Sequence, residues 1–184
     1  MSKSAIFLDR DGTINVEKEY LHRIEDWEWI PGAINAIKLI NQLGYLAIVV
    51  TNQGGIARGF YSEQAVVTLH QHVDQMLAAE RARVDAYYYC PHHSEYGEVR
   101  NCTCRKPAPG MLLAAQRDFD IDMSTSFLIG DKAIDTTAAE NAGVSPILVK
   151  TGYGEKERPS TPSSTVFKKD ILEAVIYIRD IGVL

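Results

Sequence analysis

The sequence predicts an α/β fold, a doubly wound and mostly parallel sheet with helices on both faces. Short apolar runs alternate with amphipathic segments along the chain, a pattern typical of strand and helix units in succession. The apolar runs are unbroken rather than alternating with polar residues, which favours parallel strands buried on both faces. Polar residues follow the ends of four runs, and ligand sites of open α/β sheets lie there.

Each predicted element has its own local signal. Helices are expected where apolar residues recur at helical spacing next to capping residues. Residues 152–165 are rich in Gly, Pro, Ser and Thr, so we expect an irregular connection there. The predicted strands are residues 5–8, 45–50, 87–89, 127–129 and 147–149, and the predicted helices are 33–43 before Gly44, 62–77 after the N-cap Ser62, 111–119 after Pro109, 135–142 before Gly143, and a last helix after Asp170.

Length and composition limit the classes of function. A chain of 184 residues suits one domain, residues 1–184, and its 46% hydrophobic and 23% charged residues are ordinary for a soluble globule. A net charge of −5 argues against a nucleic-acid partner. No apolar stretch approaches the ~20 residues of a membrane span, and the start of the chain lacks the apolar core of a signal peptide. We therefore expect a cytoplasmic monomer that binds a small molecule.

The first predicted strand ends in a pair of carboxylates. Asp9 and Asp11 are two residues apart, so they lie on the same side if the strand continues, and Gly12 lets the chain turn away. One carboxylate can attack phosphorus while the other serves as acid and then base. A solvated Asp-Gly turn is the simpler alternative. A calcium loop is excluded because Lys18 stands where the acidic ligand is expected.

The second predicted strand ends in a hydroxyl and a glycine-bearing turn. Thr51 together with backbone N–H groups of this turn could hold phosphate oxygens, although an ordinary strand–helix loop has the same composition. The turn that would bind substrate consists of Asn52, Gln53 and Gly54.

Two further charged residues complete the set. Lys106 could offset the repulsion between Asp9 and a phosphate dianion, and Asp131, at the end of the fourth predicted strand, would add a carboxylate for a hard cation. Each alone is equally compatible with a solvated surface or turn. The order of all these motifs along the chain is one that the strand ends can bring together, which favours a common site.

The segment of about residues 90–105 combines three cysteines with histidine. Cys90, His92, Cys102 and Cys104 offer three sulfur ligands and one nitrogen ligand, which suits a closed structural Zn²⁺ site. His93 is the alternative nitrogen ligand, and free thiols beside a surface histidine are the alternative without metal. A metal here would hold Lys106, two residues beyond Cys104, in position.

These motifs together resemble the haloacid dehalogenase superfamily of phosphatases. That resemblance implies a Rossmann-like fold, without a large cap domain here, and catalysis through an aspartyl-phosphate on Asp9. It further implies that Asp11 is the acid and base, and that Mg²⁺ is held by Asp9, Asp131 and the backbone carbonyl of Asp11. The matching segments are Asp9-Arg10-Asp11-Gly12-Thr13, Thr51-Asn52, Lys106-Pro107 and Gly130-Asp131-Lys132-Ala133-Ile134-Asp135.

The Cys-x-His and Cys-x-Cys-Arg-Lys-Pro segments resemble a narrower group of capless members. It contains heptose 1,7-bisphosphate 7-phosphatases and histidinol-phosphate phosphatases, and over most of its length the chain looks like the former, apart from Gly54, where many members have serine. The resemblance implies removal of the 7-phosphate of D-glycero-D-manno-heptose 1,7-bisphosphate in bacterial heptose and lipopolysaccharide synthesis. The substrate-binding residues it implies are Arg105, Lys132, Glu17, Lys18, Glu19 and Tyr20.

Three alternatives stay open at this point. Histidinol phosphate is the second candidate substrate within the enzyme class. A phospho-acceptor signalling domain also combines aspartates, threonine and lysine on an α/β sheet, but it would keep its phosphoryl group for minutes. A zinc-dependent nucleic-acid module conflicts with the acidic balance of the chain.

Overall fold

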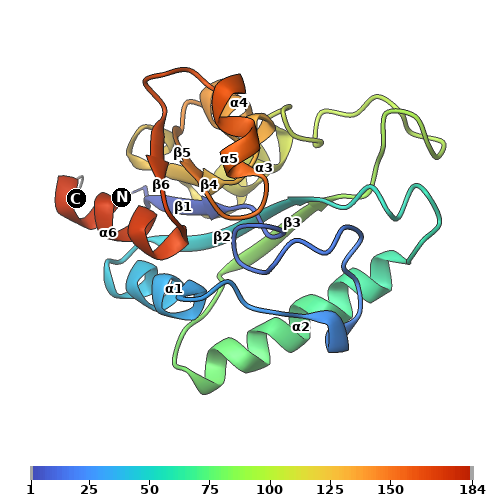
Figure 1. Ribbon diagram of the computed structural model, residues 1–184, viewed down its shortest axis with the longest axis horizontal. Coiled ribbons are helices and arrows are strands. Elements are labelled where there is room, and N and C mark those ends of the chain that lie inside the picture. Colours follow the sequence, from blue (N-terminus) through green and yellow to red (C-terminus); the bar gives the residue numbers. More distant parts are fainter. Residues whose placement is uncertain (1, 183–184) are drawn as a thin grey trace.

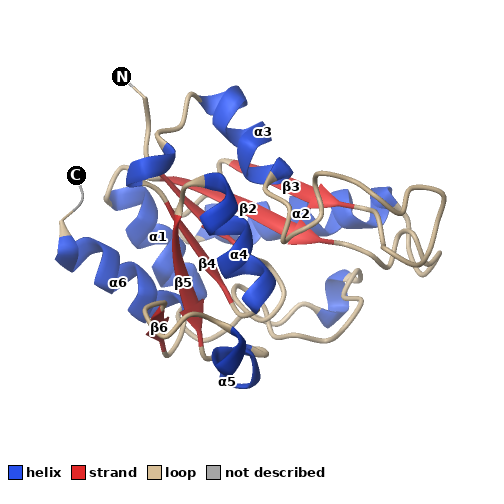
Figure 2. Ribbon diagram, turned by 90° about the horizontal axis from the view of Figure 1, so that it is seen from above, coloured by secondary structure: helices blue, strands red, loops and turns tan. Residues whose placement is uncertain are grey.

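The computed structural model describes residues 2–182 and contains a six-stranded parallel sheet between two layers of helices (Figures 1 and 2). The strand order is β3-β2-β1-β4-β5-β6, and every neighbouring pair is parallel. The predicted fold class is confirmed. The strands are β1 (Ala5–Leu8), β2 (Leu46–Asn52), β3 (Ala86–Cys90), β4 (Phe127–Gly130), β5 (Ser145–Val149) and β6 (Val166–Lys168).

The helices begin and end close to the predicted caps. The Ser62 side chain accepts a hydrogen bond from the Ala65 backbone N–H, and Asp170 caps the last helix in the same way. Gly143 ends its helix in the left-handed conformation, at φ 74°. The helices are α1 (Ala33–Gln42), α2 (Glu63–Ala79), α3 (Gly110–Phe119), α4 (Ala133–Ala142), α5 (Gly154–Glu157) and α6 (Ile171–Ile181), with 3₁₀ turns at Ile24–Asp26, Met123–Thr125 and Arg158–Ser160.

The sheet separates two apolar cores, and β1 contributes to both. Ile6 and Leu8 pack in the core formed with α1, α2 and α6. Ala5 and Phe7 face the opposite side and pack in the core formed with α3 and α4. Because neighbouring residues of a strand point to opposite faces, a strand buried on both sides must be apolar throughout. This explains the unbroken apolar run that precedes Asp9.

The structure differs from the sequence prediction mainly after residue 150. The expected irregular connection at residues 152–165 contains α5 and a 3₁₀ turn, and the strand β6 that follows it was not predicted. β6 has three half-buried residues at the sheet edge, too few for an apolar run to be recognised. Helix α4 also begins at Ala133, two residues before the predicted start.

The strand order places the candidate site. Connections from β1 run to β2 and β3 on one side, whereas β4, β5 and β6 lie on the other, so the order reverses between β1 and β4. In open α/β sheets a crevice forms beyond the carboxyl ends of the two strands at this reversal. Asp9 follows β1 and Asp131 follows β4.

Among the described residues, no helix has the length and hydropathy to cross a membrane.

Candidate active site

Lys106 is buried between two carboxylates and a backbone carbonyl. Its Nζ lies 2.8 Å from Asp9 Oδ1 and 2.6 Å from Asp135 Oδ1, and it donates to the Val50 carbonyl at 2.8 Å. Burial alone would lower the pKa of Lys106, but the charges of Asp135 and Asp9 outweigh it and raise the pKa. The lysine is therefore a fixed positive charge against Asp9.

Three carboxylates meet beside this lysine. Oxygen atoms of Asp9, Asp131 and Asp135 lie within 4.8 Å of one another, and all three residues are buried. Asp131 Oδ2 accepts from the Tyr153 backbone N–H at 2.8 Å, but Oδ1 has no hydrogen-bond partner among residues 2–182. Burial, and then the negative charge of Asp9, raise the pKa of Asp131 to about 8. A buried oxygen donor set with one unpartnered carboxylate oxygen suits a hard cation such as Mg²⁺.

Gly12 allows the chain after β1 to pass close to Asp131. Its φ is 85°, and a Cβ atom there would lie 2.3 Å from Asp131 Oδ2. Any side chain would thus displace the carboxylate that completes the cluster. Gly12 is therefore required for two reasons: a side chain would collide with Asp131, and its positive φ favours glycine.

Asp11 is held by three side chains. Arg10, which is 1% exposed, and Asn15 donate to its Oδ1, while Gln53 donates to Oδ2 at 3.1 Å. Burial opposes ionisation of Asp11, but the charge of Arg10 and these hydrogen bonds outweigh it and lower the pKa. Asp11 is thus an oriented carboxylate at the wall of the cleft.

The turn after β2 connects the cleft to Lys106. Thr51 is buried and lines the cleft. The Asn52 side chain accepts from the Lys106 backbone N–H at 3.0 Å and donates to its carbonyl at 3.1 Å. Asn52 therefore fixes the backbone of the lysine, an arrangement that the sequence analysis did not anticipate.

These residues line a cavity of about 410 Å³, a size suited to a small ligand. Of the predicted substrate-binding residues, Lys18 is not among its lining residues and instead pairs with Glu28 at 2.9 Å. Lys132 pairs with Glu17 at 3.0 Å inside the cavity. The cavity is lined by Asp9, Asp11, Glu17, Glu19, Tyr20, Leu21, Thr51, Asn52, Gln53, Gly54, Tyr61, His93, Arg105, Lys106, Lys132, Ile134 and Tyr153.

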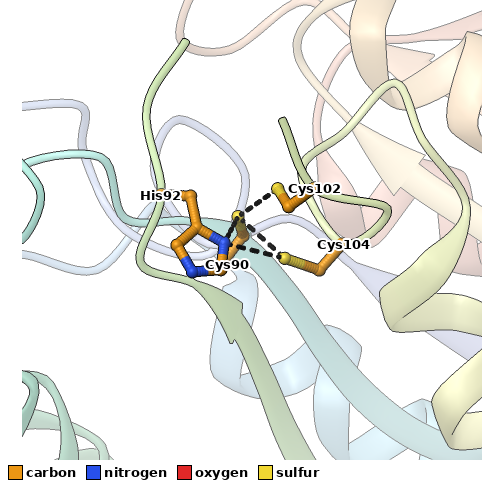
Figure 3. A group of neighbouring side chains, drawn as sticks. All are labelled: Cys90, His92, Cys102 and Cys104. Carbon is orange, nitrogen blue, oxygen red and sulfur yellow. Dashed lines mark hydrogen bonds between the residues drawn. The ribbon is translucent and has the colours of Figure 1, made fainter. Parts of the chain in front are cut away.

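The predicted zinc ligands lie together at the end of β3 (Figure 3). Cys90 Sγ is 3.7 Å from Cys102 Sγ and 3.1 Å from Cys104 Sγ, and His92 Nδ1 is 3.4 Å from Cys104 Sγ. Tetrahedral Zn–S bonds of about 2.3 Å put sulfur atoms roughly 3.8 Å apart. The donor set fits a structural zinc ion with modest adjustment. His93, the alternative ligand, lines the cavity instead.

The cysteine and histidine cluster is joined to the cleft by Arg105. One guanidinium nitrogen of Arg105 donates to the His92 carbonyl at 2.9 Å. Arg105 forms no ion pair within residues 2–182. The side chain thus presents an uncompensated positive charge to the cavity.

Sequence reasoning missed several residues of the site. The sequence places Asp135 in a motif without indicating its contact with Lys106, and it indicates no role for Arg10, Asn15, Tyr61 and Tyr153. The alternation of Asp9 and Asp11 could be recognised from local spacing. The partners of these carboxylates come from distant segments, so no local spacing indicates them.

Comparisons with known proteins show the family to which the chain belongs. A family model described as HAD-hydrolase-like matches residues 103–174. D-glycero-β-D-manno-heptose-1,7-bisphosphate 7-phosphatase from Pasteurella multocida is 44% identical over 94% of this chain and 93% of its own length. The chain belongs to this phosphatase family. The family's enzymes of the same name from Vibrio cholerae and Escherichia coli K12 are 44% and 46% identical, over 98% and 89% of this chain and 95% and 86% of their own lengths.

Solved structures of heptose bisphosphate phosphatases share the fold of this chain. The D,D-heptose 1,7-bisphosphate phosphatase of B. bronchiseptica, complexed with magnesium and phosphate, superimposes with a TM-score of 0.89 at 32% identity, over 97% of this chain and 99% of that one. The enzyme from Burkholderia thailandensis gives a TM-score of 0.73 at 28% identity, over 96% and 99% of the two chains.

We predict that Mg²⁺ stabilises the protein more at about pH 8.5 than at about pH 6. The pKa of Asp131 rises from its ordinary 3.8 to about 8 in the folded, metal-free protein. The folded state therefore binds the extra proton between these values, and its stability falls as pH rises through them. A cation that replaces this proton offsets the loss at high pH. Melting temperatures with and without MgCl₂ at both pH values measure the effect.

The control for this prediction is Asp131→Asn, which should lose most of the gain at high pH. An equal Mg²⁺ effect at both pH values in the unmodified protein would contradict the assignment of Asp131 to the cation.

Proposed function

We propose that this protein is a Mg²⁺-dependent phosphomonoesterase that removes the 7-phosphate of D-glycero-β-D-manno-heptose 1,7-bisphosphate. The observation that carries the proposal is the buried pair of Asp9 and Lys106 at the base of a cleft, 2.8 Å apart, beside two further carboxylates. The names of the related enzymes supply the substrate and its anomer. In this role the protein would act as a cytoplasmic monomer in heptose synthesis for lipopolysaccharide.

Asp9 is the proposed nucleophile, because its carboxylate lies at the base of the cavity with Lys106 holding one oxygen. Asp9, Asp131 and the backbone carbonyl of Asp11 would hold Mg²⁺, with Asp135 beside them. Bound Mg²⁺ shields the charge of the phosphate and stabilises the charge of the transition state. Lys106 and Thr51 are proposed to bind the oxygens of the transferring phosphoryl group.

Asp11 is the proposed acid and base. In the first step Asp9 forms a bond to phosphorus, the bond from phosphorus to the sugar oxygen breaks, and Asp11 gives that oxygen a proton. In the second step Asp11 takes a proton from water, which attacks phosphorus and releases Asp9. The low pKa of Asp11 in the free protein makes it ionised between turnovers. A phosphate dianion bound nearby favours its protonation.

Substrate selection is assigned to the charged rim of the cavity. The uncompensated charge of Arg105 suits the phosphate that is not cleaved, because a guanidinium binds phosphate through two parallel hydrogen bonds. Lys132, Glu17, Glu19 and Tyr20 line the same cavity and can hold hydroxyl groups of the sugar. Lys18 would join them in substrate binding once its exposed ion pair with Glu28 opens.

The proposed substrate is tested with a panel of phosphate esters. We expect Mg²⁺-dependent phosphate release to be fastest with the β anomer of heptose 1,7-bisphosphate, and slower with the α anomer, fructose 1,6-bisphosphate and histidinol phosphate. Initial rates of phosphate release give kcat/KM for each compound. A higher kcat/KM for histidinol phosphate would transfer the assignment to the sister activity, and a phosphoprotein that persists for minutes would favour a signalling domain.

Asp9→Asn and Asp11→Asn should each abolish turnover, because one removes the nucleophile and the other the acid and base. The circular dichroism spectrum of each variant should match that of the unmodified protein, since an amide is nearly isosteric with a carboxylate. Substantial turnover by Asp9→Asn would contradict the covalent mechanism.

Zinc is proposed as a structural ion that orders the loop carrying Arg105 and Lys106. We predict that removing zinc, with Mg²⁺ restored afterwards, lowers kcat/KM and makes residues 91–101 more sensitive to proteolysis. Elemental analysis establishes the zinc content. The Cys102→Ser variant should lose zinc without the use of a chelator and show the same decrease in kcat/KM. Full activity in protein verified to be free of zinc would overturn this role.

A further inference from the structure

The two oxygens of Asp11 have different surroundings. Oδ1 accepts from Arg10 Nε and Nη2 at 3.3 and 3.1 Å and from Asn15 Nδ2 at 3.0 Å. Oδ2 lies 3.0 Å from Arg10 Nη2 but accepts one hydrogen bond, from Gln53 Nε2 at 3.1 Å. A carboxylate oxygen that already accepts three hydrogen bonds has no lone pair left for a proton. Oδ2 is therefore the oxygen that can carry the catalytic proton.

Gln53 is bound at every polar atom of its side chain. Its Nε2 donates to Asp11 Oδ2 and, at 2.8 Å, to Thr51 Oγ1. Its Oε1 accepts from the Tyr61 hydroxyl at 2.7 Å. Gln53 is 2% exposed, and a buried amide oxygen that loses its hydrogen-bond partner is costly. The Gln53 amide thus links Asp11, the proposed acid and base, to the Thr51 hydroxyl, which is proposed to bind the phosphoryl group.

Tyr61 is itself held firmly in place. Its ring lies directly over Gly55, where a Cβ atom would approach Tyr61 Cε1 to 2.3 Å. The ring also stacks on His22, with centroids 4.7 Å apart and planes 13° apart. Burial raises the pKa of Tyr61 to about 12, so the hydroxyl keeps its proton at every pH at which a phosphatase would be assayed.

We propose that Tyr61 is a positioning residue that acts through Gln53 on the acid and base Asp11. The Tyr61 hydroxyl fixes the Gln53 amide, and that amide holds Asp11 Oδ2 and Thr51 Oγ1 in a constant relation. In the first chemical step the proton leaves Asp11 Oδ2 for the leaving oxygen. In the second step the same oxygen receives a proton from water. This inference rests on the proposed function, and it assigns to Gln53 the role of linking Tyr61 to Asp11 and Thr51.

The test compares Tyr61→Phe, Gln53→Leu and the double variant, with steady-state kinetics on heptose bisphosphate. We expect Tyr61→Phe to lower kcat about tenfold, which corresponds to one lost hydrogen bond to a buried group, with KM nearly unchanged. The melting temperature should fall by a few degrees, because the Gln53 amide oxygen loses its partner. Gln53→Leu should lower kcat at least as much. The double variant should be no slower than Gln53→Leu, because Tyr61 acts only through Gln53.

The matched control is Tyr89→Phe, which removes a hydroxyl that donates to Glu63 at 2.8 Å outside the cavity and should leave kcat unchanged. A kcat of Tyr61→Phe equal to that of the unmodified protein, a loss confined to KM, or multiplying losses in the double variant would overturn the inference. Absence of heptose bisphosphatase activity in the unmodified protein would instead defeat the proposed function.

Discussion

The balance of charge around Lys106 is the constraint on which the rest of the site depends. Three buried carboxylates meet at this point, and mutual repulsion would keep them from ionising together. Lys106 compensates two of them, Asp9 and Asp135, through contacts of 2.8 and 2.6 Å. Asp131 is left with an unpartnered oxygen and a raised pKa. Lys106 thus balances two of the three carboxylates, and in the proposed function a divalent cation would balance the third.

The fold supplies this arrangement by combining distant segments at one edge of the sheet. β1 and β4 adjoin at the reversal of strand order and deliver Asp9 and Asp131. Lys106 comes from the segment after the cysteine and histidine cluster, and Asn52 at the end of β2 binds its backbone. In Figures 1 and 2 the loops after β2 and β3 extend from the same end of the sheet. Substrate binding and catalysis thereby share one set of strand ends.

How much of this the sequence could predict depends on the range of each interaction. The central strands and the pair Asp9 and Asp11 follow from local spacing. Lys106 and Asp131 are candidates by charge and position, and the order of the motifs along the chain assigns them to the same site. Edge strand β6 has too few residues for a recognisable pattern. The contact of Tyr61 with Gln53 depends on the path of the loop over Gly55. Such a path is set by tertiary packing, which spacing along the chain does not encode.

Chemical trapping can show whether Asp9 becomes phosphorylated during turnover. The protein is mixed with substrate and Mg²⁺, quenched in acid within milliseconds, and reduced with borohydride, which converts an aspartyl-phosphate to homoserine. Peptide mass spectrometry then locates the modified residue. We expect homoserine at position 9 only when substrate is present. Substrate turnover without modification at Asp9, or modification of a different residue, would contradict it.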